Sequence, residues 1–387
     1  MSDHKELLHK IGGYTEYLVN NSTHQSPVWN KEQQRSGKPN KWNYIDGCML
    51  SAILSLYALN KNSLFLSFSD GYMSAFVKED GSINTYRQEE YNLDNINSGK
   101  ALFALYDLTG KQRYRLGIET LYRQLQNSPR TAQGSFWHKK IYPNQVWLDG
   151  LYMAMPFYME YETRFHQMKS YLDIIRQFRT VRQHMRSPLT GLYFHGYDET
   201  REMPWADPET GCSPCVWSRS IGWFAMALTD TIEKMDERIY FEYRELCTML
   251  KELVDALLPY QHEGGMFYQV VDQPEAQGNY PETSGTSMIA YAILKAARMG
   301  ILPARYRKYG EKAFWGTAER YLRFDGEAIH LGGICLVAGL GGESRRDGSL
   351  GYYLSEPVVE NEAKGVAPFV MAYTEILRDK GNLSLAL

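Results

Sequence analysis

An aspartate stands between an indole and the start of a helical pattern in the segment VWLDGLYM, residues 146–153. Asp149 precedes a glycine and an apolar run, and the segment before it carries His138, Lys139 and Trp147 toward the same carboxyl group. An aspartate at a helix start can cap free backbone N–H groups. Aromatic and apolar neighbours that exclude water also favour the protonated form of a carboxylic acid. Asp149 is therefore a candidate proton donor, with helix capping as the alternative.

A second carboxylate, Asp94, lies in the segment YNLDNINSG, at the start of the preceding apolar helix. A nearby anion raises the proton affinity of a carboxylic acid, so Asp94 would support Asp149 as a proton donor. Asp94 is equally suited to cap its own helix.

His195, in GLYFHGYDE, follows a turn signal and is flanked by aromatic residues. A single histidine is more often satisfied by structural contacts than functional, so its role depends on its neighbours.

Arg219 and Trp223 lie one turn apart in a further apolar helix, whose first residues read SRSIGW. A guanidinium group can bind a carboxylate through two parallel N–H bonds. A cation is disfavoured at a helix start by the helix dipole, which indicates a compensating anion near Arg219. The indole of Trp223 could stack on a sugar ring, but packing in the core is the expected role of a tryptophan on an inner helix.

Helical periodicity of apolar residues extends over almost the whole chain. Every second helix begins with a similar pattern around a glycine, as in YIDG, WLDG and ETSG, which indicates a degenerate repeat of helix pairs. These helices are apolar on all sides, whereas the helices between them are amphipathic. The twelve predicted helices span residues 4–19, 45–60, 63–78, 95–108, 112–127, 148–162, 166–185, 217–235, 239–260, 284–299, 304–323 and 364–379.

Apolarity and loop length together predict how these helices are arranged. A helix that is apolar all round belongs inside a protein, and an amphipathic helix belongs on its perimeter. The links from inner to outer helices are short, and most links from outer to inner helices are long. In a closed ring of antiparallel helices all long links lie at one end, where long loops are usually functional. We therefore predict an all-α fold, an (α/α)6 barrel of six helix pairs with long loops rimming one end, in one catalytic domain over residues 1–387. An open α-solenoid is the alternative.

Composition narrows the class of partner. The net charge of -3 and the pI near 6.3 give no electrostatic reason to expect nucleic acid or an anionic membrane as a partner. The polar first residues do not resemble a secretory signal, and the scattered cysteines suit a reducing compartment, so a cytoplasmic location is expected. Cys212 and Cys215 are interpreted as structural thiols, because no second pair or histidines follow at metal-ligand spacing. No metal and no organic cofactor is expected.

Several long blocks resemble a known family: FWHKKIYPNQVWLDGLYM, GLYFHGYDE, MPWADPETGCSP, WSRSIGW, ETSGTSMIAYAI and YYLSEPVVENEAKGV. Over roughly residues 40–380 the chain resembles the unsaturated rhamnogalacturonyl hydrolases, glycoside hydrolase family 105. The fold that this resemblance implies is a single (α/α)6 barrel, in agreement with the helix pattern. The implied partner is a short oligosaccharide that ends in a 4,5-unsaturated galacturonic acid, usually linked to rhamnose. The second cysteine of GCSPC, Cys215, departs from the family pattern, so the resemblance implies no role for the nearby part of the rim.

The resemblance also implies roles for individual residues. Asp149 matches the catalytic acid/base, which would protonate the C4=C5 vinyl ether, and Asp94 matches a second active-site aspartate. The residues that match the substrate pocket are Tyr44, His138, Lys139, Trp147, His195, Arg219 and Trp223. An unsaturated glucuronyl hydrolase acting on glycosaminoglycan-type or other glucuronate fragments is the nearest alternative. A sugar 2-epimerase, which would need a pair of catalytic histidines, and a non-catalytic helical scaffold are more distant ones.

Overall fold

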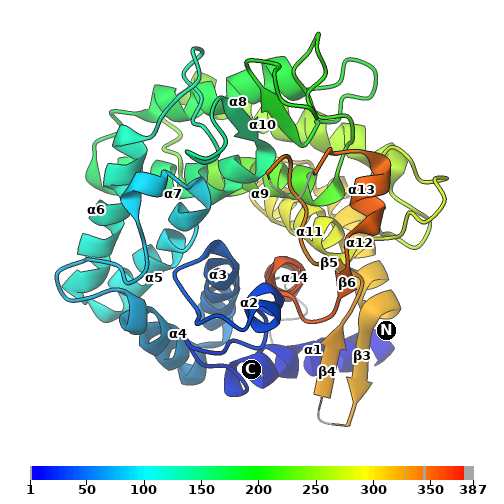
Figure 1. Cartoon of the computed structure of the whole chain (residues 1–387). Coiled ribbons are helices and arrows are strands. Elements are labelled where there is room, and N and C mark those ends of the chain that lie inside the picture. The colour runs from blue at the N-terminus through cyan, green and yellow to red at the C-terminus, as the bar shows by residue number, and fades with distance from the viewer. Residues whose placement is uncertain (1, 327, 343–345, 379–387) are drawn as a thin grey trace.

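The computed structural model describes residues 2–326, 328–342 and 346–378, and within them the helices form two concentric rings (Figure 1). The inner ring consists of α3 (Tyr44–Asn60), α5 (Gly99–Thr109), α7 (Leu148–Phe165), α9 (Ser218–Lys234), α11 (Thr283–Arg298) and α14 (Ala363–Leu377). The outer ring consists of α1 (Ser2–Asn20), α4 (Ser63–Phe76), α6 (Gln112–Asn127), α8 (Tyr171–Met185), α10 (Tyr240–Leu257) and α12 (Arg307–Tyr321).

The inner ring is closed, because each inner helix packs on the next. α7 contacts α9, α9 contacts α11, α11 contacts α14, and α14 contacts α3, which reaches α7 again through α5. All residues of α14 are buried, whereas α6 is buried on one face only. The (α/α)6 barrel is thus confirmed, and the closed ring excludes the open solenoid. One large apolar cluster includes residues of both rings.

Glycines allow the starts of neighbouring inner helices to approach each other closely. A Cβ atom on Gly47 would lie 2.6 Å from the Cα of Ser98, and one on Gly285 would lie 2.5 Å from the Oγ of Ser218. Real Cβ atoms do not approach other atoms this closely, so a side chain at either position would force the helices apart. The repeated glycine at the helix starts is therefore a requirement of packing.

The structure adds elements that the periodicity did not reveal. The helix predicted over 95–108 begins as a 3-10 turn, η2 (Leu93–Ile96), before α5. The predicted helix over 304–323 ends where an antiparallel hairpin begins, because Leu322 has extended backbone angles. The short elements of the loops are η1 (Gln88–Glu90), η3 (Leu258–Tyr260), η4 (Ala304–Tyr306), α2 (Lys31–Ser36), α13 (Leu350–Ser355), β1 (Gln145–Trp147), β2 (Gly196–Asp198), β3 (Leu322–Asp325), β4 (Ala328–Leu331), β5 (Ile334–Cys335) and β6 (Val358–Val359).

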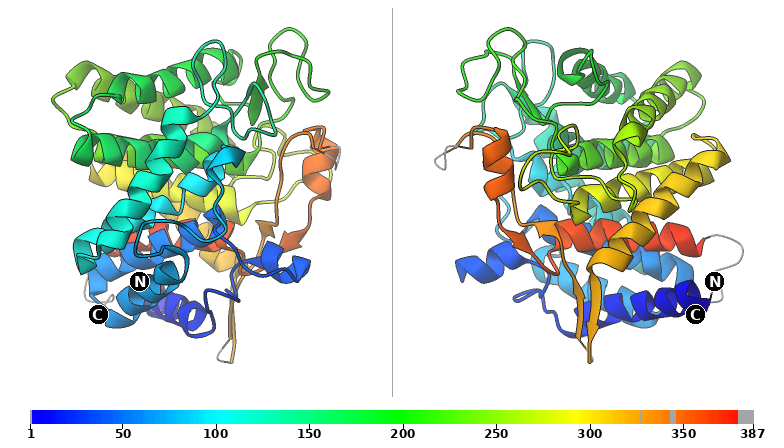
Figure 2. Two further views of the ribbon diagram at one scale, coloured as in Figure 1. Left: turned by 60° about the vertical axis from the view of Figure 1, so that its left-hand side comes forward. Right: turned by 90° about the vertical axis from the view of Figure 1, so that its right-hand side faces the viewer.

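The long connections lie together at the end of the barrel where the inner helices begin, as predicted. Figure 2 shows α2, α13 and these connections on one side of the molecule. Antiparallel pairs tie the connections to one another: β1 pairs with β2, and β5 pairs with β6. We call this end of the barrel the mouth.

Two further findings bear on the sequence-based predictions. Cys212 and Cys215 are buried free thiols, which agrees with a structural role. None of the helices in the described residues combines the length and apolarity needed to cross a membrane.

Candidate active site

The β1–β2 pair brings Asp149 and His195 together. Trp147 is opposite Gly196 in this pair, and the backbone N–H of Leu148 donates to the carbonyl of His195 at 3.1 Å. Because α7 begins directly after β1, Asp149 lies in the first helical turn beside His195. The Nε2 atom of His195 lies 3.2 Å from Oδ2 of Asp149. Residues 46 positions apart in the chain therefore share one site.

A stack of rings covers this pair on one side. The indole of Trp147 stacks on the imidazole of His138, with ring centroids 4.4 Å apart, and on the ring of Tyr142 at 5.0 Å. His195 meets the edge of the same indole at 5.4 Å. Trp147 and His138 are buried. The segment before α7 thus supplies the aromatic, water-excluding surroundings that the sequence predicted for Asp149.

Asp94 enters the same site from η2. The backbone N–H of Leu93 donates to the carbonyl of His138 at 3.1 Å, which fixes η2 against the segment before α7. The Oδ2 atom of Asp94 then lies 2.6 Å from Nζ of Lys139, and its Oδ1 atom lies 3.6 Å from Nε2 of His138. Asp94 is therefore in a close ion pair with Lys139.

The charge states of this group follow from burial and pairing. Burial opposes ionisation of Asp94, but the charges of Lys139 and His138 outweigh it and hold the pKa of Asp94 below its ordinary value. Burial likewise disfavours the Lys139 ammonium, yet Asp94 raises the pKa of Lys139. Burial lowers the pKa of His138 to about 4, so its imidazole is neutral near pH 7.

The carboxyl group of Asp149 has a different environment. Its side chain is 14% exposed, and its buried Oδ2 atom accepts no hydrogen bond from the described residues. Among the described residues, no lysine or arginine forms an ion pair with Asp149, and its one ion-pair contact is with His195. Asp149 also does not cap its helix through a described side-chain hydrogen bond. The capping alternative therefore finds no support in the geometry.

Two residues that position His195 were missed by the sequence analysis. The hydroxyl of Tyr353, on α13, lies 2.7 Å from Nδ1 of His195. The ring of Tyr353 stacks on Trp217, which contacts the other face of His195 with centroids 4.8 Å apart. The only available signal was that YYLSEP belongs to a block shared with the family, because α13 is separated from His195 by more than 150 residues.

A second charged group missed by the sequence analysis borders the mouth. Lys364, at the start of α14, contacts Glu32 of α2 and lies 3.0 Å from Glu362. Its Nζ atom is 6.0 Å from the ring centroid of Tyr44, which is the predicted pocket residue on α3. Burial disfavours the Lys364 ammonium, but Glu362 and Glu32 raise its pKa. The predicted position of Tyr44 at the mouth is consistent with these contacts.

Arg219 is buried among protein acceptors. Its Nε donates to Oγ of Ser284 at 2.7 Å, and its terminal nitrogens contact the carbonyls of Cys335 and Leu336. The carboxylate of Glu282 lies 3.7 Å away, so the compensating anion expected at this helix start is Glu282. The side chain is 1% exposed. That Arg219 binds a substrate carboxylate stays a prediction. Such binding would require the guanidinium group to give up one of these protein acceptors for the substrate.

Trp223 packs in the barrel interior. Its indole is 2% exposed and stacks on the ring of Tyr152 with centroids 4.8 Å apart. Tyr152 lies one turn after Asp149 on α7. The described contacts thus favour the core role for Trp223, and its role in sugar stacking stays a prediction.

A cavity of about 430 Å³ adjoins this group at the mouth. Asp94 and Lys139 line it on one side, and Tyr44 lines it together with Glu32 and Lys38 of the segment around α2. The cavity therefore has both cations and hydroxyl or amide donors, which suits a polar ligand. Among the described residues, no group of three His, Cys, Asp or Glu side chains could hold a metal ion.

Known proteins are similar to this chain in sequence and in fold. The model of Glycosyl Hydrolase Family 88 matches residues 16–380. A solved family 105 glycoside hydrolase from C. acetobutylicum ATCC 824 is 40% identical, with a TM-score of 0.88 over 95% of this chain and 98% of that chain. The chain therefore belongs to the family that the Glycosyl Hydrolase Family 88 model describes. The predicted resemblance to family 105 is confirmed by the solved relative. It is accordingly a glycosidase.

More distant relatives differ in what their names state. The unsaturated rhamnogalacturonyl hydrolase YesR of Bacillus subtilis (strain 168) is 22% identical over 278 residues, which are 70% of this chain and 74% of that protein. The unsaturated glucuronyl hydrolase from Bacillus sp. GL1, responsible for glycosaminoglycan degradation, is 14% identical, with a TM-score of 0.67 over 97% of this chain and 96% of that chain. The glucuronyl hydrolase shares the fold of this chain, whereas the rhamnogalacturonyl hydrolase is similar in sequence, so the fold alone does not select between the two substrates.

Proposed function

We propose that the protein removes the non-reducing terminal 4,5-unsaturated galacturonic acid from lyase-generated rhamnogalacturonan oligosaccharides, by hydration of the C4=C5 vinyl ether. The observation that carries this proposal is the contrast between two carboxylates in one site. Asp94 is in an ion pair with Lys139, whereas Asp149 pairs with no lysine or arginine among the described residues, lies beside His195 and has one buried oxygen without a described hydrogen bond. Such a pair assigns the roles of charged binding group and proton donor to different residues.

The reaction needs one residue that acts first as acid and then as base. Protonated Asp149 donates its proton to C4, and positive charge develops at C5 and O5 of the ring. The Asp149 carboxylate then accepts a proton from the water that attacks C5. The hemiketal opens and the aglycone leaves. Ordinary glycoside hydrolysis instead uses two carboxylates that flank the anomeric carbon.

The other predicted residues support this step. Trp147 and His138 exclude water from one side of Asp149, and His195 is held beside it by Tyr353. Lys139 and Arg219 are the proposed cations for the uronate carboxylate. The Lys139 side chain is 23% exposed at the cavity and can reach a ligand directly, whereas Arg219 must first exchange a protein acceptor.

The substrate is tested with two unsaturated disaccharides, one from rhamnogalacturonan and one from chondroitin, by following the loss of absorbance of the conjugated double bond. We expect the higher kcat/KM with the rhamnogalacturonan product. A higher value with the chondroitin product would reverse the choice of uronic acid while keeping the hydration chemistry. Absence of turnover with every unsaturated uronide would overturn the proposed function.

The proton donor is tested by Asp149→Asn. A positioned acid/base contributes about 10²–10⁴-fold, so we expect turnover to fall by that factor. The matched control is Asp80→Asn, which changes an exposed aspartate far along the chain and should keep wild-type turnover. In heavy water the product should carry deuterium at C4. More than a tenth of wild-type rate in Asp149→Asn, or no deuterium at C4, would contradict the assignment.

A further inference from the structure

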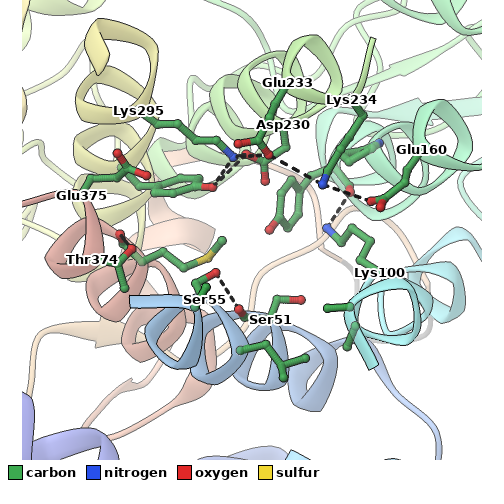
Figure 3. Close-up of a pocket in the computed structure, with 18 of the residues that line it drawn as sticks. Ser51, Ser55, Lys100, Glu160, Asp230, Glu233, Lys234, Lys295, Thr374 and Glu375 are labelled. Carbon is green, nitrogen blue, oxygen red and sulfur yellow. Dashed lines mark hydrogen bonds and ion pairs between the residues drawn. The ribbon is translucent and has the colours of Figure 1, made fainter. Parts of the chain in front are cut away.

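A cavity of about 270 Å³ lies at the end of the barrel opposite to the mouth (Figure 3). Its walls come from the middle and later turns of α3, from the later turns of α9, α11 and α14, from residues 152–160 of α7 and from the first turns of α5. The described lining residues include none of the residues predicted for the active site. The cavity is therefore separate from the site at the mouth.

Charged side chains of both signs line this cavity, and most of them pair with each other. Helix C-terminal ends carry a partial negative charge, and the last turns of α7, α9 and α11 hold basic residues that oppose it. The described ion pairs of the wall, between 2.6 and 3.6 Å, are Lys295 with Asp230 and Glu233, Lys234 with Glu160, and Arg298 and Arg378 with Glu375.

Lys100 is the exception. Its Nζ atom donates to the carbonyl of Tyr152 at 3.1 Å and lies 3.2 Å from the centroid of the same ring. Over the described ranges, no carboxylate lies within 4.0 Å of this ammonium group, and the Tyr152 carbonyl is the one hydrogen-bond acceptor that it contacts. An ammonium group without a counter-ion in a part-buried cavity is unfavourable, because its charge has lost some of its water. The vacant N–H groups of Lys100 therefore favour an anion.

A second polar group supports this interpretation. Ser51 of α3 lines the cavity, and its buried hydroxyl finds no hydrogen-bond partner among the described residues. Figure 3 shows Ser51 and Lys100 on neighbouring parts of the wall. Buried polar groups are usually paired, so an unpaired hydroxyl and an ammonium without a counter-ion in the wall of one cavity indicate a missing ligand. The ring of Tyr152 beside Lys100 is held in place by its stack on Trp223.

We propose that this cavity binds a small anion with a single carboxylate or oxyanion group, for which Lys100 is the counter-ion and Ser51 a second donor. The volume is below the roughly 300–1,000 Å³ of pockets for drug-sized ligands, so the ligand is small. Carboxylates and sulfate-type or phosphate-type oxyanions share this chemistry, and the experiment separates them.

The binding should depend on pH. Burial lowers the pKa of Lys100 to about 7, against the opposing effects of Cys48 and Asp230. An anion favours the charged ammonium, so binding takes up a proton when the pH is above this pKa. The affinity should therefore fall as pH rises above 7, approaching about tenfold per pH unit. The titratable and charged groups that face Lys100 are Cys48 on α3, Tyr152 and Glu160 on α7, Asp230 on α9 and Lys295 on α11.

The test is calorimetric titration of the full chain with sodium sulfate and, separately, with D-galacturonate. Each titration is run at pH 6.5 and 8.5, and at pH 8 in two buffers of different ionisation enthalpy. We expect one of these anions to bind more tightly at pH 6.5, with uptake of about one proton per anion at pH 8. Sulfate reports an oxyanion site, and galacturonate reports a carboxylate site.

Variants separate this cavity from the mouth. Lys100→Met should weaken binding at least tenfold and abolish proton uptake, and Lys100→Arg should bind without proton uptake. The matched control, Lys251→Met, removes the same charge from the outer helix α10 and should bind as the wild type does. Thermal unfolding confirms that each variant is folded. Unchanged binding by both Lys100 variants, or no binding of either anion by the wild type, would overturn the proposal.

Discussion

Two aspartates occupy the same place in the repeated helix start, and the structure predicts opposite consequences for their substitution. Asp46 lies in YIDG and Asp149 in WLDG. Asp46 is buried, and its Oδ2 atom accepts hydrogen bonds from the Tyr72 hydroxyl at 2.6 Å and from the side-chain amides of Asn40 and Asn43 at 2.7 and 2.9 Å. These bonds attach α4 and the segment between α2 and α3 to the first turn of α3.

The magnitude follows from these donors. The other oxygen, Oδ1, accepts from Nε1 of Trp29 at 3.0 Å, so the NH₂ group of Asp46→Asn must face buried donors on one side or the other. Each unsatisfied buried donor costs about 1–3 kcal/mol, so we expect a loss of at least about 1–3 kcal/mol in the free energy of unfolding. Asp149 has a buried oxygen without a described hydrogen bond, so Asp149→Asn should change the same quantity by less than about 1 kcal/mol.

Urea unfolding of both variants, combined with turnover of the unsaturated rhamnogalacturonan disaccharide, checks this prediction. Asp46→Asn should lose stability and keep appreciable activity while folded. Asp149→Asn should keep its stability and lose activity. If Asp149→Asn proved as destabilised as Asp46→Asn, the carboxyl group of Asp149 would be a structural acceptor, and our explanation of the site would be wrong.

Three other predictions test the surroundings of the site. Lys139→Met removes the charge that keeps the pKa of Asp94 low, so burial should raise this pKa. The acidic limb of the kcat/KM profile should then move to higher pH, and a profile identical to that of the wild type would contradict this. Tyr353→Phe removes the hydroxyl beside Nδ1 of His195 and should lower kcat about tenfold with less effect on KM, whereas equal changes in both would indicate a purely structural role. Gly47→Ala places a methyl group against backbone atoms of the next inner helix start and should cost about 1–3 kcal/mol in urea unfolding, which an unchanged midpoint would disprove.

The helices and their arrangement could be predicted because they depend on local patterns. An all-round apolar helix such as α14 has to be inside, and an amphipathic one such as α6 has to be outside. The glycines at the inner helix starts and the alternation of loop lengths then favour a closed ring with its long loops at one end. The hairpin of β3 and β4 was not predicted. Its strands are too short to show a clear alternating pattern, and β3 follows directly after α12.

The site could be predicted only in part. Asp149, Trp147, His138 and Lys139 are close in sequence, so their proximity is local, and Asp94 follows from its place on the adjacent inner helix. His195 reaches Asp149 through the β1–β2 pairing, a long-range contact that no local pattern specifies. The family resemblance pointed to it, whereas the backbone pairing explains it.

What the sequence determined by itself was the twelve helices of the two rings, the faces that they bury and the two aspartates, Asp94 and Asp149, at helix starts. Only the tertiary structure decided that YIDG holds a buried carboxyl group surrounded by donors, while WLDG presents one to the mouth. It also decided that Lys364 and Tyr353 belong to the site and that Arg219 is enclosed by protein acceptors. The reason is physical: the charge and hydrogen-bonding of a carboxyl group depend on atoms that long loops bring to it, and those loops carry no periodic pattern of their own.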